Sequence, residues 1–316
     1  MTSGRGGVAY AIDSHCHLGR FFEDPTRGVA RIEEMRRGGM TACIAAVIGD
    51  RSVIGMSDRG LRLLREPAPG ELFDGAARDL DALWEACRRG GTSPAAIVTD
   101  IERLRETGGV IVAAIEGLDC LEGRVERVAH FHDRGVRVMQ LVHYRINELG
   151  DIQTEPPRHG GLTAFGREVV EECARLGILV DVAHATFETV KGVVGLVDKP
   201  IILSHSILGD RHPRCIDDDH ARLVASTGGM IGAWATRLAV DDFDDYIDNI
   251  VRLTDAVGAD HVGIGTDMDA VRAPVYDDYS AFYVIPDALR TRGMAWTDIE
   301  KISGGNFMRV FAAAVG

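Results

Sequence analysis

Short apolar runs of strand length recur along the chain, and each is followed by a stretch with helical periodicity. Continuous apolar runs are typical of strands buried on both faces, as in a parallel sheet covered by helices. The predicted strands are residues 8–13, 41–48, 110–116, 136–143, 178–184, 201–205, 230–234 and 261–267. The intervening segments, such as 163–177 and 242–258, predict amphipathic helices. Eight alternating units predict an α/β fold, a closed (β/α)8 TIM barrel rather than an open sheet.

One long segment interrupts this alternation between the second and third predicted strands. Residues 49–109 contain two helix-like stretches, 59–65 and 78–89, separated by the turn-forming sequence PAPG at 67–70. No strand is expected there, so we interpret the segment as a helical insertion that decorates the barrel. Since no linker, low-complexity tract or repeat divides the chain, we expect a single domain over residues 1–316.

Composition and charge narrow the classes of function. The 316 residues carry a formal net charge of −13, which disfavours a nucleic-acid partner or an anionic membrane surface. Residues 1–10 lack the apolar core of a signal peptide, and no run approaches the roughly 18 apolar residues of a membrane span. Six cysteines without a C-x-x-C pair favour a reducing compartment. We therefore expect a cytoplasmic protein of enzyme size, without a membrane or nucleic-acid partner.

An H-x-H pair follows the first predicted strand. Residues two apart on a strand point to the same side, so His15 and His17 can face the barrel axis together. Two imidazoles on one face form half of a zinc ligand set. The alternative is a pair of hydrogen-bonded polar residues near a loop. Cys16, which lies between them, is expected to point the other way and not to bind metal.

Three further candidate ligands end later strands, where the active sites of such barrels lie. Glu116 is the one polar residue of its strand, and a buried carboxylate is costly unless it is paired or bound to metal. His184 and His205 end the fifth and sixth strands. Each of the three has an ordinary alternative, a salt bridge for the glutamate and a hydrogen bond for a histidine. Five ligands exceed the need of one tetrahedral zinc with an open position, so we predict two divalent metal ions.

Other polar residues at the same end of the barrel suit catalysis and substrate binding. Asp267 ends the eighth strand and suits a general base. His143 ends the fourth strand and can donate a hydrogen bond to a developing oxyanion, although a packed core histidine is the alternative. The basic cluster Arg211, His212 and Arg214 can bind a substrate carboxylate, or can be a solvated loop.

Taken in order, these residues resemble the membrane (renal) dipeptidase family, peptidase family M19, a branch of the amidohydrolase superfamily. The resemblance runs from residue 13 to residue 311, nearly the whole chain. Its most specific motifs are GLTAFGR at 161–167, LVDVAH at 179–184, ILSHS at 202–206, DHVGIGTD at 260–267 and GGNFMRVF at 304–311.

The resemblance implies a binuclear zinc dipeptidase, in which a hydroxide between two metal ions attacks the amide of a dipeptide or dipeptide-like substrate. It implies that His15 and His17 hold one ion, that His184 and His205 hold the other, and that Glu116 bridges them. The family's habit also favours a homodimer.

The resemblance implies three more roles around the metal pair. Asp267 is expected to be the proton-shuttling acid and base, and His143 to polarise the scissile carbonyl. Arg214 is expected to bind the terminal carboxylate of the dipeptide. These roles complete the candidate site.

Two departures from the family pattern keep other activities open. The family usually has H-x-D in the first strand, and His17 in place of that aspartate removes one negative charge, which bears on metal preference. Family members also carry a substrate-contacting tyrosine after the seventh strand, where this chain reads GAWAT at 232–236. The alternatives are another amidohydrolase activity, on N-acyl-amino acids, lactones or cyclic amides, or a barrel that binds a ligand without turnover.

Overall fold

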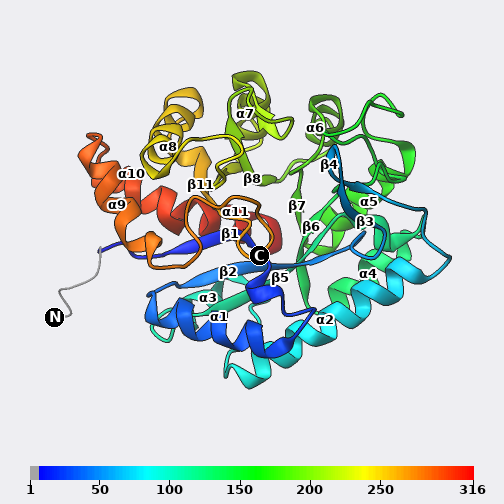
Figure 1. The fold of residues 1–316 in the computed structure, drawn as a ribbon, viewed down its shortest axis with the longest axis horizontal. Helices are drawn as coiled ribbons and strands as arrows, with labels where there is room; N and C mark the ends of the chain where they lie inside the picture. The colour runs from blue at the N-terminus through cyan, green and yellow to red at the C-terminus, as the bar shows by residue number, and fades with distance from the viewer. Residues whose placement is uncertain (1–6) are drawn as a thin grey trace.

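The computed structural model describes residues 7–316, in which eight parallel strands form a barrel (Figure 1). Their order is β1 (Ile12–Cys16), β2 (Ala42–Ile48), β5 (Val110–Glu116), β6 (Val136–Gln140), β7 (Leu179–Asp181), β8 (Ile202–Leu208), β10 (Met230–Trp234) and β11 (Val262–Gly265). Beyond the last strand, the backbone N–H of Asp267 donates to the carbonyl of His15 at 2.9 Å. The first and last strands are therefore joined at the mouth, and the predicted (β/α)8 barrel is confirmed.

Helices surround the barrel (Figure 1). The helices that link barrel strands include α1 (Pro25–Arg37), α4 (Glu126–Asp133), α5 (Ala164–Leu176), α6 (Phe187–Val194), α7 (Asp218–Ala225) and α8 (Phe243–Val257). After β11 come α9 (Ala281–Thr291), α10 (Trp296–Glu300) and α11 (Asn306–Val315). The helices predicted over 163–177 and 242–258 are confirmed as α5 and α8. Each begins after a side-chain cap, since Thr163 and Asp242 accept hydrogen bonds from backbone N–H groups of the first turn.

The barrel strands are buried on both faces because alternate side chains enter two different cores. In β5, Val110 and Val112 belong to the interior core, whereas Ile111 and Ile115 pack in the layer between the sheet and the surrounding helices. The interior core also contains side chains of α11, among them Phe311. The apolar filling of the barrel therefore includes the C-terminal helix.

The segment between β2 and β5 differs in part from the expected helical insertion. It contains α2 (Glu71–Arg89), which covers the predicted helix 78–89, and α3 (Val98–Leu104). The prediction of a helix over 59–65 is wrong, because β4 (Gly60–Leu63) pairs there with β3 (Ile54–Ser57) in an antiparallel hairpin. The turn explains the difference: Gly60 has a φ of 94°, and the Ser57 hydroxyl donates to the Gly60 carbonyl. The expectation that the segment holds no strand is therefore also wrong.

Several strands end earlier than their apolar pattern predicts. His143 and His184 lie three residues beyond the ends of β6 and β7, and Asp267 lies two residues beyond the end of β11. His184 has a φ of 68° and Asp267 a φ of 55°. These left-handed conformations take the chain out of the extended region, so the residues stand on loops at the barrel mouth.

Within residues 7–316, none of the helices combines the length and the apolar character that crossing a membrane requires. All six cysteines lie in this part of the chain and are free thiols. Residues 1–6, which belong to the segment inspected for a signal peptide and to the expected single domain, lie outside the described residues.

Candidate metal centre

The sequence-predicted metal ligands lie together around the carboxylate of Glu116 at the barrel mouth. All five side chains are buried. The Nε2 atoms of four histidines lie close to the Glu116 oxygens, at 3.5 Å for His15, 3.3 Å for His17, 3.3 Å for His184 and 3.6 Å for His205. The Nε2 atom of His143 lies 3.4 Å from the same carboxylate. Residues from five different strands or strand ends therefore converge on one point.

Three groups of side chains have ligand atoms within 4.8 Å of one another. They are His15, His17 and Asp267; His15, Glu116 and His205; and Glu116, His143 and His184. Glu116 belongs to two of the groups, as a bridging ligand would. The grouping differs from the expected pairs in one respect, because His205 falls with His15 in this geometry rather than with His184.

The donors around Glu116 fit a pair of divalent ions. The Nε2 atoms of His15 and His17 are buried and make no hydrogen bond within residues 7–316. The Nε2 atoms of His184 and His205 lie 3.2 Å apart, so at most one of them can carry a proton in that contact. Imidazole nitrogens and carboxylate oxygens are the ligands that zinc takes in hydrolytic sites.

Neighbouring polar groups orient these ligands from behind. The Nδ1 atom of His17 lies 3.2 Å from the carbonyl of Ala46, and the Nδ1 atom of His205 lies 2.9 Å from the Ser204 hydroxyl. Gln140 donates to the Glu116 carboxylate at 3.4 Å. Such contacts fix the ring orientation, and here they direct the opposite nitrogen, Nε2, toward the centre.

The electrostatics of the centre favour a deprotonated Glu116 and neutral rings at His184 and His205. Burial by itself would raise the pKa of Glu116, but nearby histidines, His143 first among them, outweigh it and hold that pKa well below its ordinary value. Burial lowers the pKa values of His184 and His205 well below the ordinary histidine value, and the positive charge of Arg214 adds to both effects. Metal binding requires a carboxylate and neutral imidazoles, which are the forms favoured at these three residues.

Asp267 stands at the edge of this cluster. Its Oδ1 atom lies 3.3 Å from the Nε2 atom of His17, and its side chain remains 13% exposed. Burial would lower the pKa of His17, but the neighbouring carboxylates of Asp267 and Glu116 raise it well above the ordinary value. The Asp267 carboxylate therefore contacts His17 of the cluster and also lines the cavity above it.

The sequence did not single out Asp50, which lies directly behind His143. Its side chain is fully buried, and its Oδ1 atom lies 2.7 Å from the Nδ1 atom of His143. Its Oδ2 atom accepts the backbone N–H groups of Tyr144 and Arg145, each at 3.1 Å. The available signal was its position two residues after a predicted strand, at the same barrel end as the other polar residues.

Of the predicted basic cluster, Arg214 reaches the centre. Its buried guanidinium has Nη1 at 2.5 Å from the Nε2 atom of His184, donates from Nη2 to the His205 carbonyl at 3.2 Å, and lies over the ring of Trp234. A metal ion and this guanidinium cannot share the same nitrogen lone pair of His184. Arg211, in contrast, is exposed and pairs with Asp241, and His212 lines the cavity.

The cluster opens into a cavity of about 380 Å³. Its floor includes Glu116, His143, His184 and Asp267, and Trp234 lines it as well. Its remaining wall comes from the end of β2, from the β3–β4 hairpin and from the loops after β6, β8, β10 and β11. The helical-insertion segment therefore contributes directly to the candidate site.

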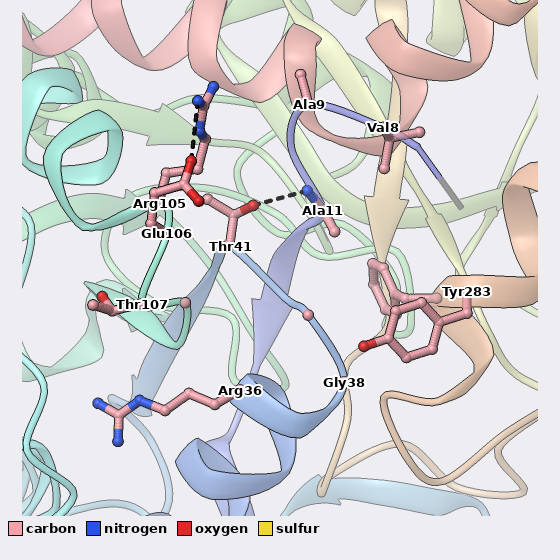
Figure 2. Close-up of a pocket in the computed structure, with 13 residues that line it drawn as sticks. Val8, Ala9, Ala11, Arg36, Gly38, Thr41, Arg105, Glu106, Thr107 and Tyr283 are labelled. Atoms are coloured by element: carbon pink, nitrogen blue, oxygen red, sulfur yellow. Dashed lines mark hydrogen bonds and ion pairs between the residues drawn. The ribbon is translucent and has the colours of Figure 1, made fainter. Parts of the chain in front are cut away.

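A larger hollow, of about 500 Å³, lies at the other end of the barrel (Figure 2). Ala11 and Thr41, which are linked there by a hydrogen bond of 3.1 Å, directly precede β1 and β2. Its arginines already have partners: Arg36 donates to two backbone carbonyls and Arg105 pairs with Glu106. Chemistry in these barrels takes place at the carboxyl ends of the strands, so the smaller cavity is the candidate active site.

Comparison with protein families matches residues 72–315 to the model described as membrane dipeptidase (peptidase family M19). The chain belongs to this family. The matched region contains Glu116, His143, His184, His205 and Asp267, while His15, His17 and Asp50 precede it. The resemblance drawn from the motifs is thus confirmed.

Among curated relatives, the dipeptidase aclJ of Aspergillus oryzae is 32% identical over 208 residues, which are 62% of this chain and 49% of the relative. The dipeptidase verJ of Clonostachys rogersoniana is 29% identical over 245 residues, which are 75% of this chain and 59% of the relative. The chain thus spans about half the length of the curated relatives it matches.

Solved structures share the fold over nearly the whole chain. An amidohydrolase from Pseudomonas aeruginosa has a TM-score of 0.79 at 24% identity and covers 97% of both chains. A metallopeptidase from Rhodobacter sphaeroides, solved with a phosphinate mimic of the dipeptide L-Ala-D-Ala, has a TM-score of 0.82 at 19% identity, covering 97% of this chain and 99% of that one. These similarities concern the fold.

Proposed function

We propose that this M19 family member is a binuclear metal-dependent dipeptidase, which hydrolyses a dipeptide or a dipeptide-like amide. The observation that carries the proposal is the convergence of four histidine Nε2 atoms within 3.6 Å of the Glu116 carboxylate, at the floor of the mouth cavity. The dipeptidase relatives, and the dipeptide mimic bound by the Rhodobacter sphaeroides metallopeptidase, support the substrate class.

Two divalent ions, zinc by the family's habit, would be held by His15, His17, Glu116, His184 and His205. When bound, they would supply Lewis acidity that lowers the pKa of water toward about 7, which makes hydroxide available to attack the amide at neutral pH. Because His17 replaces a carboxylate of the usual family pattern, this centre carries one negative charge fewer. The other catalytic and binding roles belong to the side chains around this centre.

Asp267 is the acid and base of the proposed reaction. Its carboxylate contacts His17 at 3.3 Å and faces the cavity, so it can accept the proton of the attacking water and deliver it to the leaving amine. The loop is held in place, since the N–H of Asp267 donates to the His15 carbonyl. A left-handed φ of 55° keeps the side chain at this position and has a cost in backbone strain.

His143 contacts the scissile carbonyl in this proposal. Asp50 accepts from Nδ1 of the ring. Burial would lower the pKa of His143, but Asp50 and Glu116 raise it above the ordinary value, which favours the ring that also carries a proton on Nε2, on the side of Glu116 and the cavity. A donor held in advance at the position where negative charge develops stabilises the transition state. Asp50 therefore acts on the reaction through the orientation of His143.

Arg214 binds the terminal carboxylate of the substrate in this proposal. Its guanidinium lies beside His184 and His205 and is buried among neutral groups and the Trp234 ring. A carboxylate can replace the contact with His184 by two parallel charge-assisted hydrogen bonds. This anchor would place the peptide bond over the metal centre.

A dipeptide library assayed with zinc-loaded protein tests the function. We expect turnover of dipeptides with a free C-terminus, and slower turnover of the corresponding C-terminal amides because the contact with Arg214 is lost. If no dipeptide is cleaved but lactones, N-acyl-amino acids or cyclic amides are, the function is that of a different amidohydrolase. Equal rates on free and amidated dipeptides would show that Arg214 does not bind the terminal carboxylate of the substrate.

A further inference from the structure

An ion pair spans the cavity wall away from the metal cluster. Arg62 lies on β4 of the hairpin, and Glu155 lies in the loop between β6 and α5, which the hairpin reaches (Figure 1). The Nη2 atom of Arg62 donates to Oε1 of Glu155. Both side chains line the same cavity as Glu116 and His143. A substrate that fills the cavity therefore meets this pair.

The Arg62 guanidinium is only partly satisfied. Its Nη1 atom is buried and has no hydrogen-bond partner in the described chain, residues 7–316. A guanidinium presents its donors in a planar fork that matches a carboxylate, and a buried donor without an acceptor costs about 1–3 kcal/mol. A second carboxylate beside Glu155 would complete the hydrogen bonding of this fork.

The charge of the wall favours the same kind of ligand. Apart from the catalytic cluster, its permanently charged residues are Arg59, Arg62 and Arg272 against the single carboxylate of Glu155. The chain as a whole has a net charge of −13. The other two carboxylates of the lining, Glu116 and Asp267, lie at the metal cluster, so the positive excess is confined to the wall and favours an anionic group there.

Arg62 and Arg214 occupy different surroundings. Arg214 contacts His184 and the His205 carbonyl at the metal cluster, which suits the main-chain carboxylate next to the scissile bond. Arg214 also donates from Nε to Gln153. Arg62 pairs instead with Glu155, which lies two residues farther along the same loop and lines the cavity wall. A group recognised by Arg62 therefore belongs to a substrate side chain.

We infer that Arg62 is a specificity residue that binds a side-chain carboxylate of the substrate, and that Glu155 orients its guanidinium. This inference rests on the proposed dipeptidase function and narrows the substrate class to dipeptides that contain aspartate or glutamate. The main-chain carboxylate stays with Arg214.

The test compares kcat/KM for paired dipeptides that differ only in a glutamate or glutamine side chain, at each substrate position. For the wild-type protein we expect a preference for the glutamate member. Arg62→Met should reduce kcat/KM on that member by about 10- to 100-fold, the range for a lost charge-assisted contact, and change the glutamine member by less than about 2-fold. Arg65→Met is the matched control, because Arg65 follows the same hairpin but pairs with Glu71 outside the cavity.

A second variant keeps the inference testable if Arg62→Met disturbs the hairpin. Glu155→Gln removes the carboxylate that orients the guanidinium but keeps Arg62 itself, so KM for the glutamate dipeptide should rise while KM for the glutamine dipeptide changes little. Unchanged selectivity in both variants overturns the inference. A loss on every dipeptide with a free C-terminus, but not on the amides, would assign Arg62 to the main-chain carboxylate and also overturn it.

The failure of this inference differs from the failure of the proposed function. If the wild-type protein cleaves no dipeptide, the dipeptidase function itself is wrong. If it cleaves neutral dipeptides without preferring acidic ones, the function stands and the role of Arg62 is wrong.

Discussion

The Nδ1 atom of His143 lies 2.7 Å from the Oδ1 atom of Asp50, in a contact that is buried on both sides. The two residues are 93 positions apart in the sequence, and the same carboxylate also accepts two backbone N–H groups of the loop that carries His143. Asp50 therefore holds both the ring and its loop. This relationship suits a residue that positions His143 without touching the substrate.

Asp50→Asn should lower kcat by about 10- to 100-fold, the range for a residue that orients a functional histidine. The carbonyl oxygen of the asparagine can still accept a hydrogen bond on one side. Its NH2 group, however, would face other donors, namely the Nδ1–H of His143 or the backbone N–H groups of Tyr144 and Arg145. Metal content and KM should change little, because Asp50 contacts no metal ligand directly. Asp79→Asn, which breaks the ion pair between Asp79 of α2 and Arg51, is the control. A kcat equal to wild type would show that Asp50 has a structural role alone.

Asp267→Asn should abolish most turnover while the metal ions stay bound. Asparagine keeps the size of the side chain but cannot accept or deliver a proton, and general acid and base groups contribute about 10²- to 10⁴-fold. The measurement is kcat together with metal content on the same sample. Undiminished turnover with full metal occupancy would refute the acid and base role.

Gly265→Ala should destabilise the barrel severely. A Cβ at this position in β11 would lie 1.8 Å from the carbonyl oxygen of Ser204 on β8, so the backbones must move apart. We expect a loss of about 3 kcal/mol or more in the free energy of unfolding. The control is Gly75→Ala in α2, where the nearest atom is 4.0 Å away and helix propensity predicts a gain of up to about 1 kcal/mol. Similar midpoints of denaturation for the two variants would contradict this packing.

His220 should make stability depend on pH. Burial lowers its pKa from 6.5 to about 4 in the folded protein, against only a small opposing effect of Asp217. The unfolded chain therefore binds more protons between these values, so the folded state loses stability as pH falls from about 6.5 toward 4. At about 1.4 kcal/mol per pKa unit, the upper bound is about 3 kcal/mol. His220→Leu should flatten this slope in denaturant titrations at pH 7 and pH 4.5, and an identical slope in both proteins would contradict the shift.

The fold could be predicted because the barrel strands are buried on both faces, which makes each one a continuous apolar run. The same pattern singled out Glu116, because a buried carboxylate at the end of an apolar strand is costly unless it is paired or bound to metal. Strand ends were less predictable, because the apolar pattern continues to Val182 and Ala183 after β7 has ended at Asp181. Burial continues there without strand pairing.

The hairpin and Asp50 were not predictable for a different reason. Strands of four residues such as β3 and β4 give too few alternating positions to exclude a helix. Asp50 acquires its role from a contact with His143 across 93 residues, which local patterns do not encode. The pair of Arg62 and Glu155 is equally distant in sequence. The proposed metal ligands were thus visible in the sequence, whereas the residues proposed to orient His143 or to select the substrate required the fold.

Zinc content of the purified protein, measured after supplementation with zinc, is the decisive test of the binuclear centre. We predict close to two ions per chain, and Glu116→Gln should lose most of both because its carboxylate would be shared between them. The exposed ion-pair variant Arg65→Met should keep the wild-type value. A wild-type content near zero, or of one ion that Glu116→Gln leaves in place, would contradict the binuclear centre.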